Sequence, residues 1–243
     1  MSHESNQAAR LDVALAIKRT LDAFVRDFAG VALAGFLLVV LPGVLMRRLA
    51  AGDDWTTVLI TLRGVCAMLY VALVSWGVVA RLRGRALPPR DFLREGLARA
   101  QPGVQAALLV GVAIVIGLTL QLFARHGTLV GWLLDSLLLA AGLWAVCVVM
   151  PVVPVAVVER LAPMPAFRRA AALTQGNRNR TLALALLVGV TLAPSAVLVA
   201  GFAGPAGSWF TALFELLAWS LVATVPAVVY AGLRDTEVKG SPE

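Results

Sequence analysis

The sequence predicts an all-α integral membrane protein with six transmembrane helices. Hydrophobic residues make up 60% of the 243 residues and charged residues only 14%, whereas soluble domains are close to half apolar and a quarter charged. A soluble domain of this length could not bury so much apolar surface. The apolar residues also gather into runs of about 20, the length at which a helix crosses ~30 Å of hydrocarbon.

The predicted spans are separated by short polar segments. The first is short and has Pro42 near its end, and the fourth is long enough to require a tilt, a kink or a projecting end. Prolines at 151 and 226 predict kinks in the fourth and sixth spans. The spans cover residues 29–46, 58–80, 104–124, 130–158, 182–203 and 209–233.

The basic residues predict how these spans are oriented. Residues 1–28, 81–103, 159–181 and 234–243 carry 17 of the 21 Lys and Arg residues, and all four segments fall on the same side. The positive-inside rule places that side, with both termini, in the cytoplasm. Arg outnumbers Lys 19 to 2 in an Ala-, Val- and Leu-rich chain, which is typical of a GC-rich bacterial genome. We therefore expect a multi-pass protein of the bacterial inner membrane.

A repeat of about 75 residues predicts that the whole chain is a single membrane domain built from three units. Three short basic segments beginning at residues 16, 91 and 166 lie at successive offsets of 75, and Trp55, Trp132 and Trp209 lie at successive offsets of 77. Each unit is predicted to be a cytoplasmic amphipathic helix followed by a transmembrane hairpin. The units cover about residues 8–80, 88–158 and 163–233, and residues 234–243 form a short tail.

The three amphipathic helices predict contact with membrane lipids. Each has one apolar face opposite arginines, the pattern of a helix that lies in the membrane interface. A basic side chain near an anionic leaflet contributes about 1 kcal/mol of attraction. We expect anionic headgroups as partners, no nucleic acid, and headgroup contacts at Arg19, Arg94 and Arg169.

The connector at residues 159–180 has the most distinct local signals in the chain. Pro165 suits a first helical position, Gly176 suits a left-handed cap after the helix, and Asn177 suits the start of the next one. Glu159 closes an apolar run, and a carboxylate at that depth requires a donor or solvent. We expect it to accept hydrogen bonds from Arg169, from Arg178 or from the amides after Gly176, with a freely solvated side chain as the alternative.

This connector resembles the membrane-domain family of glycerophosphoryl diester phosphodiesterases and related bacterial six-span proteins. The matching residues are Glu159, Ala166-Phe167-Arg168-Arg169-Ala170, Leu173-Thr174-Gln175-Gly176-Asn177-Arg178 and the closing Tyr230-Ala231-Gly232-Leu233-Arg234. The resemblance covers about 20 residues closely and the rest loosely. It implies a six-helix membrane fold, but it does not imply phosphodiesterase activity. In that family the chemistry belongs to a separate soluble barrel with His and acidic metal ligands, which this sequence does not contain.

We expect no catalytic site, no metal site and no cofactor. The two histidines, His3 and His126, have no metal-binding spacing and no adjacent nucleophile. Cys66 and Cys147 both lie inside apolar runs, where packing is the usual role of a cysteine. The acidic residues mostly neighbour arginines on the cytoplasmic side, and solvated pairing explains them.

Three ionisable residues fall inside the predicted spans: Arg63, Asp135 and Glu215. Intramembrane charges are functional candidates by default. All three are predicted to lie near the outer interface; Arg63, for example, is 18 residues from Arg81 at the basic end, about 27 Å of helix. At that depth a charge can reach headgroups or water, so a structural or interfacial role is favoured over a functional one.

These observations favour a non-enzymatic inner-membrane scaffold that interacts with lipids or partner proteins. The alternative is a small transporter or lipid-handling protein with a path between the repeats, which would need polar groups at the membrane midplane. A third hypothesis is an accessory subunit of a lipid phosphodiesterase, and it depends on the resemblance alone.

Overall fold

The computed structural model describes residues 11–49, 53–123, 129–201 and 207–240. Over these residues the chain is helical and contains no strand. Five helical segments of the described part are long and apolar enough to cross a membrane, as expected of a multi-pass membrane protein. They are Phe28–Leu45, Val58–Leu82, Pro89–Gly117, Gly131–Glu159 and Thr211–Val238.

Each predicted span overlaps a helix or a run of helices, although several boundaries differ. In chain order they are α1 (Val13–Arg26), α2 (Phe28–Gly35), the π-helical turn η1 (Phe36–Val40), α3 (Leu41–Leu49), α4 (Asp53–Leu82), α5 (Pro89–Phe123), α6 (Leu129–Val149), α7 (Val152–Glu159), α8 (Pro163–Thr174), α9 (Arg178–Gly201) and α10 (Gly207–Gly240). The predicted span 182–203 corresponds to α9, and its last two residues lie outside the described part of the chain.

A proline explains the π-helical turn in the first span. Pro42 has no backbone N–H, and its ring clashes with the carbonyl four residues earlier, so an unmodified α-helix is disfavoured there. The N–H of Leu41 instead bonds the carbonyl of Phe36, five residues back. The wider turn keeps α2, η1 and α3 continuous through the span.

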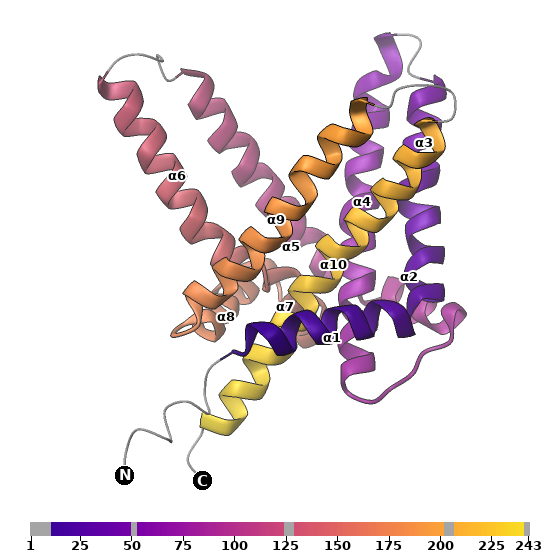
Figure 1. The fold of residues 1–243 in the computed structure, drawn as a ribbon, viewed down its shortest axis with the longest axis vertical. Helices are drawn as coiled ribbons and strands as arrows, with labels where there is room; N and C mark the ends of the chain where they lie inside the picture. Colours follow the sequence, from indigo (N-terminus) through magenta and orange to yellow (C-terminus); the bar gives the residue numbers. More distant parts are fainter. Residues whose placement is uncertain (1–10, 50–52, 124–128, 202–206, 241–243) are drawn as a thin grey trace.

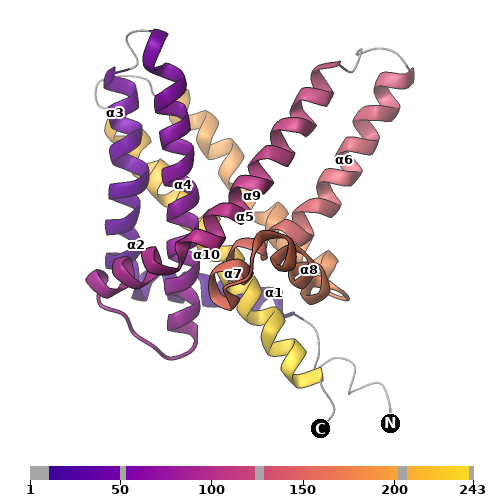
Figure 2. The same ribbon diagram turned by 180° about the vertical axis from the view of Figure 1, so that it is seen from behind.

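The second amphipathic segment, predicted as a helix that precedes the hairpin, is continuous with the span at 104–124. It forms the first turns of α5, which runs without interruption from Pro89 to Phe123 and contains Pro102. In Figure 2 this helix first crosses the lower part of the molecule and then turns upward. A proline inside a helix removes one hydrogen bond and bends the axis without ending the helix when packing supports both sides.

The fourth span is divided, as its prolines predict. α6 ends at Val149 and α7 begins at Val152, with Pro151 between them as the N-cap of α7. Pro154 is the third residue of α7, where the missing N–H has no helical partner to lose. Pro226, in contrast, lies inside α10 without ending it.

The last helix is longer than predicted. The segment predicted as a tail after residue 233 continues α10 as far as Gly240. Asp235 accepts a hydrogen bond from Arg19 of α1 at 3.0 Å, and Glu237 pairs with Arg169 of α8 at 2.6 Å. Contacts with two other helices therefore hold this last part of α10 in place.

The helices form two groups that share one end. α4 packs against both α10 and α5, and α2, η1 and α3 pack against α4 and α10. α5 and α6 form an arm that leans away from α2–α4, and α9 runs obliquely between the groups (Figure 1). α1, α8 and the first turns of α5 lie across the shared end. We call this end, formed by residues 11–27, 81–100, 159–180 and 230–240, the base.

Close helix packing near the base depends on glycine. The ring of Phe92, at the start of α5, is only 1% exposed and fits between α2 and α4. A Cβ added at Gly77 of α4 would overlap this ring, and one added at Gly30 of α2 would lie 3.1 Å from it. Phe92 therefore joins α5 to the first hairpin through a space that only glycine leaves open.

We expect Gly77→Ala to destabilise the protein, because the added methyl collides with Phe92 and overpacking costs about 1–3 kcal/mol. The control is Gly64→Ala in the same helix, where an added Cβ meets nothing within 4 Å. Alanine is intrinsically better in a helix, so the control should match or slightly exceed wild type. The measurement is the apparent melting temperature in detergent, followed by size-exclusion chromatography. Equal melting of the two variants would contradict the tight packing at Phe92.

Candidate functional site

The carboxylate of Glu159 is held by two helices. Glu159 ends α7, and its Oε2 accepts a hydrogen bond from Nε of Arg169 in α8 at 3.2 Å. Its Oε1 accepts one from the hydroxyl of Tyr230 in α10 at 3.0 Å. The Glu159 side chain is 18% exposed, so both bonds form in a partly desolvated place where charge-assisted bonds are strong.

Arg169 also connects Glu159 to the last turns of α10. Its two terminal nitrogens donate to the two carboxylate oxygens of Glu237, each at 2.6 Å. Arg234 donates to the hydroxyl of Tyr230 at 3.1 Å. We call these five residues, Glu159, Arg169, Tyr230, Arg234 and Glu237, the charge clamp. It joins α7, α8 and α10 at the base.

The clamp fixes the charge of its central residue. The hydrogen bonds from Arg169 to Glu237 favour the protonated guanidinium and outweigh its partial burial, so the pKa of Arg169 is raised above its ordinary value. A planar guanidinium can serve two carboxylates with separate nitrogens, which an ammonium group cannot do with the same geometry. Arg169 is thus a permanent cation between two acids.

The expectation for Glu159 is confirmed for one of its proposed donors. Arg169 bonds it, whereas the guanidinium of Arg178 lies 5.7 Å from the ring centroid of Trp144 on α6. Sequence reasoning missed Tyr230 and Glu237 as partners. The i,i+4 pair of Tyr230 and Arg234 was visible in the closing motif, but its contact with Glu159 spans 71 residues.

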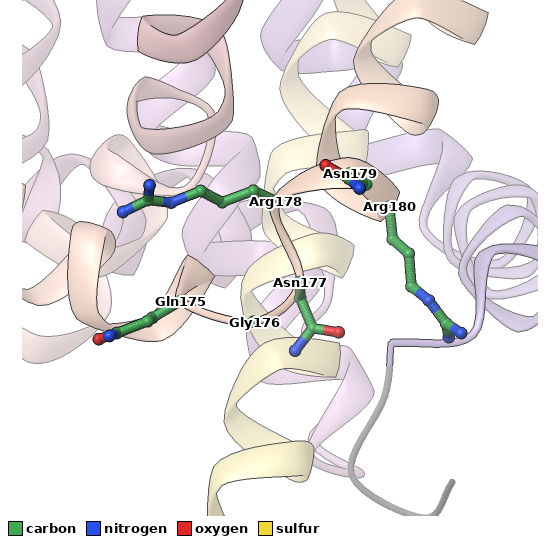
Figure 3. A pocket seen from close by; sticks show the side chains of 6 residues that line it. All are labelled: Gln175, Gly176, Asn177, Arg178, Asn179 and Arg180. Carbon is green, nitrogen blue, oxygen red and sulfur yellow. The ribbon is translucent and has the colours of Figure 1, made fainter.

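The turn between α8 and α9 adopts the predicted left-handed cap. Gly176 has φ of +83°, a conformation that costs glycine little. The backbone carbonyl of Asn177 then accepts the N–H groups of Arg180 and Thr181, so Asn177 is the residue that starts α9. A cavity of about 550 Å³ is lined by residues 175–180 (Figure 3).

This turn also holds the beginning of the described chain. Asn177 Oδ1 accepts the N–H of Leu11 at 2.9 Å, and Arg180 donates to the carbonyl of Leu11. Figure 3 shows Arg178 and Arg180 pointing in opposite directions from the first turn of α9. We call the contact of Leu11 with Asn177 and Arg180 the clasp. No local pattern predicted the clasp, because Asn177 and Arg180 are separated from Leu11 by 166 and 169 positions in the sequence.

The predicted role of Pro165 is wrong by two residues. α8 begins at Pro163, and Ala162 before it is extended with ψ of 159°. A residue that precedes proline is pushed out of the helical region, so Pro163 takes the first helical position. Pro165 is the third helical residue, whose N–H would have no helical partner in any case.

Two further ion pairs lie within the base, near the end of α4. Asp27 pairs with Arg81 at 2.9 Å, and Arg81 also donates to the carbonyl of Arg26. Burial raises the pKa of the Asp27 carboxyl, and the nearby Arg81 offsets this only in part. Arg85 and Glu95 form an exposed pair across the connection between α4 and α5.

Two of the three charged residues predicted within spans meet each other. Arg63 of α4 and Glu215 of α10 form an ion pair at 3.0 Å, with side chains 30% and 19% exposed. Asp135 is half-buried on α6, in the arm formed with α5 (Figure 1). Deeper in the same α4–α10 contact, the hydroxyl groups of Tyr70 and Ser220 share a buried hydrogen bond of 2.8 Å. The polar side chains of α4 and α10 thus stabilise the contact between these helices.

The predicted headgroup residues differ in their availability. Arg94 is exposed on α5, while Arg19 and Arg169 are engaged with Asp235 and with the clamp carboxylates. Other basic side chains of the base are exposed and lack a carboxylate partner among the described residues. They are Lys18, Arg83, Arg90, Arg160, Arg168 and Arg178.

Comparison with protein-family models, with curated proteins and with solved structures gives no match. The resemblance of residues 159–180 to the phosphodiesterase membrane-domain family therefore stays a prediction. Within the described residues, no group of three His, Cys, Asp or Glu side chains is placed to hold a metal ion.

We expect Glu159→Gln to lower the apparent melting temperature in detergent, because it leaves the Arg169 and Tyr230 donors with a weaker, neutral acceptor. Hydrogen bonds to charged groups contribute about 1.5–3 kcal/mol. Glu95→Gln is the matched control, since the exposed pair with Arg85 contributes at most about 1 kcal/mol. If both variants melt like wild type, the clamp does not stabilise the base.

Proposed function

We propose that this chain is a six-span scaffold of the bacterial inner membrane that binds anionic lipid headgroups with its base and catalyses no reaction. The observation that carries the proposal is the excess of exposed basic side chains at the base. The carboxylates of Asp22, Asp27, Glu95, Glu159, Asp235 and Glu237 are already engaged with arginines. The basic residues that remain exposed can balance a layer of lipid phosphates.

The arrangement of the helices supports six spans. α9 has 24 residues, packs against α6 and α10, and runs from the base toward the far ends of α3 and α4 (Figure 1). With α9 counted as a span, each of three units consists of a basic helical segment at the base and a hairpin above it. α1, the first turns of α5 and α8 are these basic segments.

A cytoplasmic base follows from the distribution of basic residues. Reporter fusions after Arg85 and after Gly176 should then read as cytoplasmic, and a fusion at Gly127 should read as periplasmic. Residue 127 lies outside the described residues, so its placement depends on the topology alone. A cytoplasmic reading at Gly127 would overturn the six-span topology.

A scaffold is better supported than a transporter. A transport path needs polar groups that face a substrate across the membrane midplane. Between α4 and α10, Arg63 pairs with Glu215, and the hydroxyl of Tyr70 shares a hydrogen bond with that of Ser220. These contacts join the two helices to each other. A role as an accessory subunit of a lipid phosphodiesterase rests on the sequence resemblance alone, and no contact among the described residues supports it.

Lipid binding at the base can be measured directly. We expect the triple variant Arg83→Gln, Arg90→Gln, Arg94→Gln to lose most of the enrichment of phosphatidylglycerol over phosphatidylcholine around the protein in membrane nanodiscs. Each exposed cation near an anionic surface contributes about 1 kcal/mol, so three together correspond to roughly a hundredfold change in preference.

The control for this experiment changes two charges of the base without changing its net charge. The double variant Arg85→Gln, Glu95→Gln removes an existing ion pair. It should keep the wild-type enrichment of phosphatidylglycerol. Equal enrichment around the wild type and the triple variant would overturn the lipid-binding proposal.

A further inference from the structure

An apolar groove separates the two helices of the arm. It has a volume of about 540 Å³, and its walls are α5 and α6. Met164 and Phe167 of α8 also line it, and α8 packs against both helices of the arm at the base. The groove is therefore a slot within the membrane-spanning part of the arm, bounded at the base by α8.

The walls of the groove could pack together but do not. Ala113 and Gly117 on α5, and Ala141 and Ala145 on α6, are pairs of small residues four positions apart. Such pairs normally allow two membrane helices to approach closely. A Cβ added at Gly117 or at Gly142 would nevertheless meet nothing within 4 Å. A groove lined by carbon atoms offers dispersion contacts to an apolar occupant.

The dimensions of the groove suit a single hydrocarbon chain. Its lining on α6 extends from Leu138 to Val149, about 16 Å of helix. Spread over that length, 540 Å³ corresponds to a width of about 6 Å. A single acyl chain, which is narrower than a helix of ~10 Å diameter, fits within this width.

The basic side chains near the base end select an anionic amphiphile. Arg168 follows Phe167 in the chain and lies one turn beyond Met164 on α8. It is exposed and has no carboxylate partner among the described residues. Arg178 is also exposed, and its guanidinium lies near Trp144 at the lower part of α6. A chain inserted between α5 and α6 thus has cations at the level where its headgroup would lie.

We propose that this groove binds one acyl chain of an anionic phospholipid from the leaflet at the base, with its phosphate at Arg168. The site deepens the proposed function, on which it rests, because it turns general headgroup attraction into one defined lipid position. Residues 1–10 are a poor alternative occupant, since MSHESNQAAR is mostly polar.

The test uses phosphatidylglycerol with a photoactivatable diazirine in the middle of one acyl chain, reconstituted with the full-length protein in nanodiscs. After illumination, mass spectrometry should locate the cross-links mainly within residues 109–117 and 138–149. Gly142→Leu should reduce these cross-links at least tenfold, because leucine fills the slot where the structure has open space. Gly189→Leu, at an exposed glycine of α9 that also has open space, should leave them unchanged.

The headgroup part of the site is tested with Arg168→Gln. We expect a several-fold loss of groove cross-linking by the phosphatidylglycerol probe and little change with a diacylglycerol probe of the same chain, which has no phosphate. The double variant Arg85→Gln, Glu95→Gln, which removes an ion pair without changing the net charge, is the control and should retain groove cross-linking. An equal effect of Arg168→Gln on both probes would overturn the phosphate contact.

Three other results would overturn the groove site. These are cross-links spread evenly over exposed apolar positions, groove cross-links that survive Gly142→Leu, and protein–protein cross-links through the arm that identify a second copy as the occupant. The proposed function and the groove site are tested by different variants, so either can fail without the other. Loss of phosphatidylglycerol enrichment in the triple variant at residues 83, 90 and 94 tests the basic surface, whereas Gly142→Leu changes no charge and tests only the groove.

Discussion

The ion pair between Arg169 and Glu237 is the contact on which the organisation of the base depends. Arg169 of α8 binds Glu159 of α7, whose side chain is 18% exposed and would be costly to leave unpaired, and it also binds the more exposed Glu237 of α10. One guanidinium binds a carboxylate from α7 and another from α10, so the three helices meet at this point of the base. α10 continues beyond the junction as far as Gly240.

The sequence predicted features that depend on local chemistry and missed those that depend on distant pairs. The left-handed Gly176, the cap at Asn177 and a kink at Pro151, which the structure shows as a break between α6 and α7, were predictable because each follows from one residue type and its neighbours. The bond between Glu159 and Arg169 was predictable since both lie in one short connector. Tyr230 and Glu237 could not be assigned to the same site, because no periodicity links them to residue 159 across the membrane domain.

Helix boundaries show the same division between local and distant causes. The second amphipathic segment is continuous with its span: Phe92, seated against Gly77 and Gly30, holds the first turns of α5, and the helix continues through Pro102 into the span. α10 continues past residue 233 because Asp235 and Glu237 find arginines on other helices. The local composition predicted span boundaries near residues 104 and 233, but tertiary contacts keep both helices continuous across these positions. The small residues that line the groove did not predict it, because small residues occur throughout the spans and the groove depends on how α5 and α6 are placed.

The clasp has a consequence for the order in which the protein is made. Leu11 leaves the ribosome early, but the amide and guanidinium that hold its backbone belong to residues 177 and 180. Until the third connector is synthesised, the peptide groups of Leu11 have to be satisfied by water or headgroups, and α1 remains tethered only through its own hairpin. Arg169 similarly waits for Glu237, which is synthesised 68 residues later. The contacts that close the base can therefore form only after all three basic segments and α10 have been made.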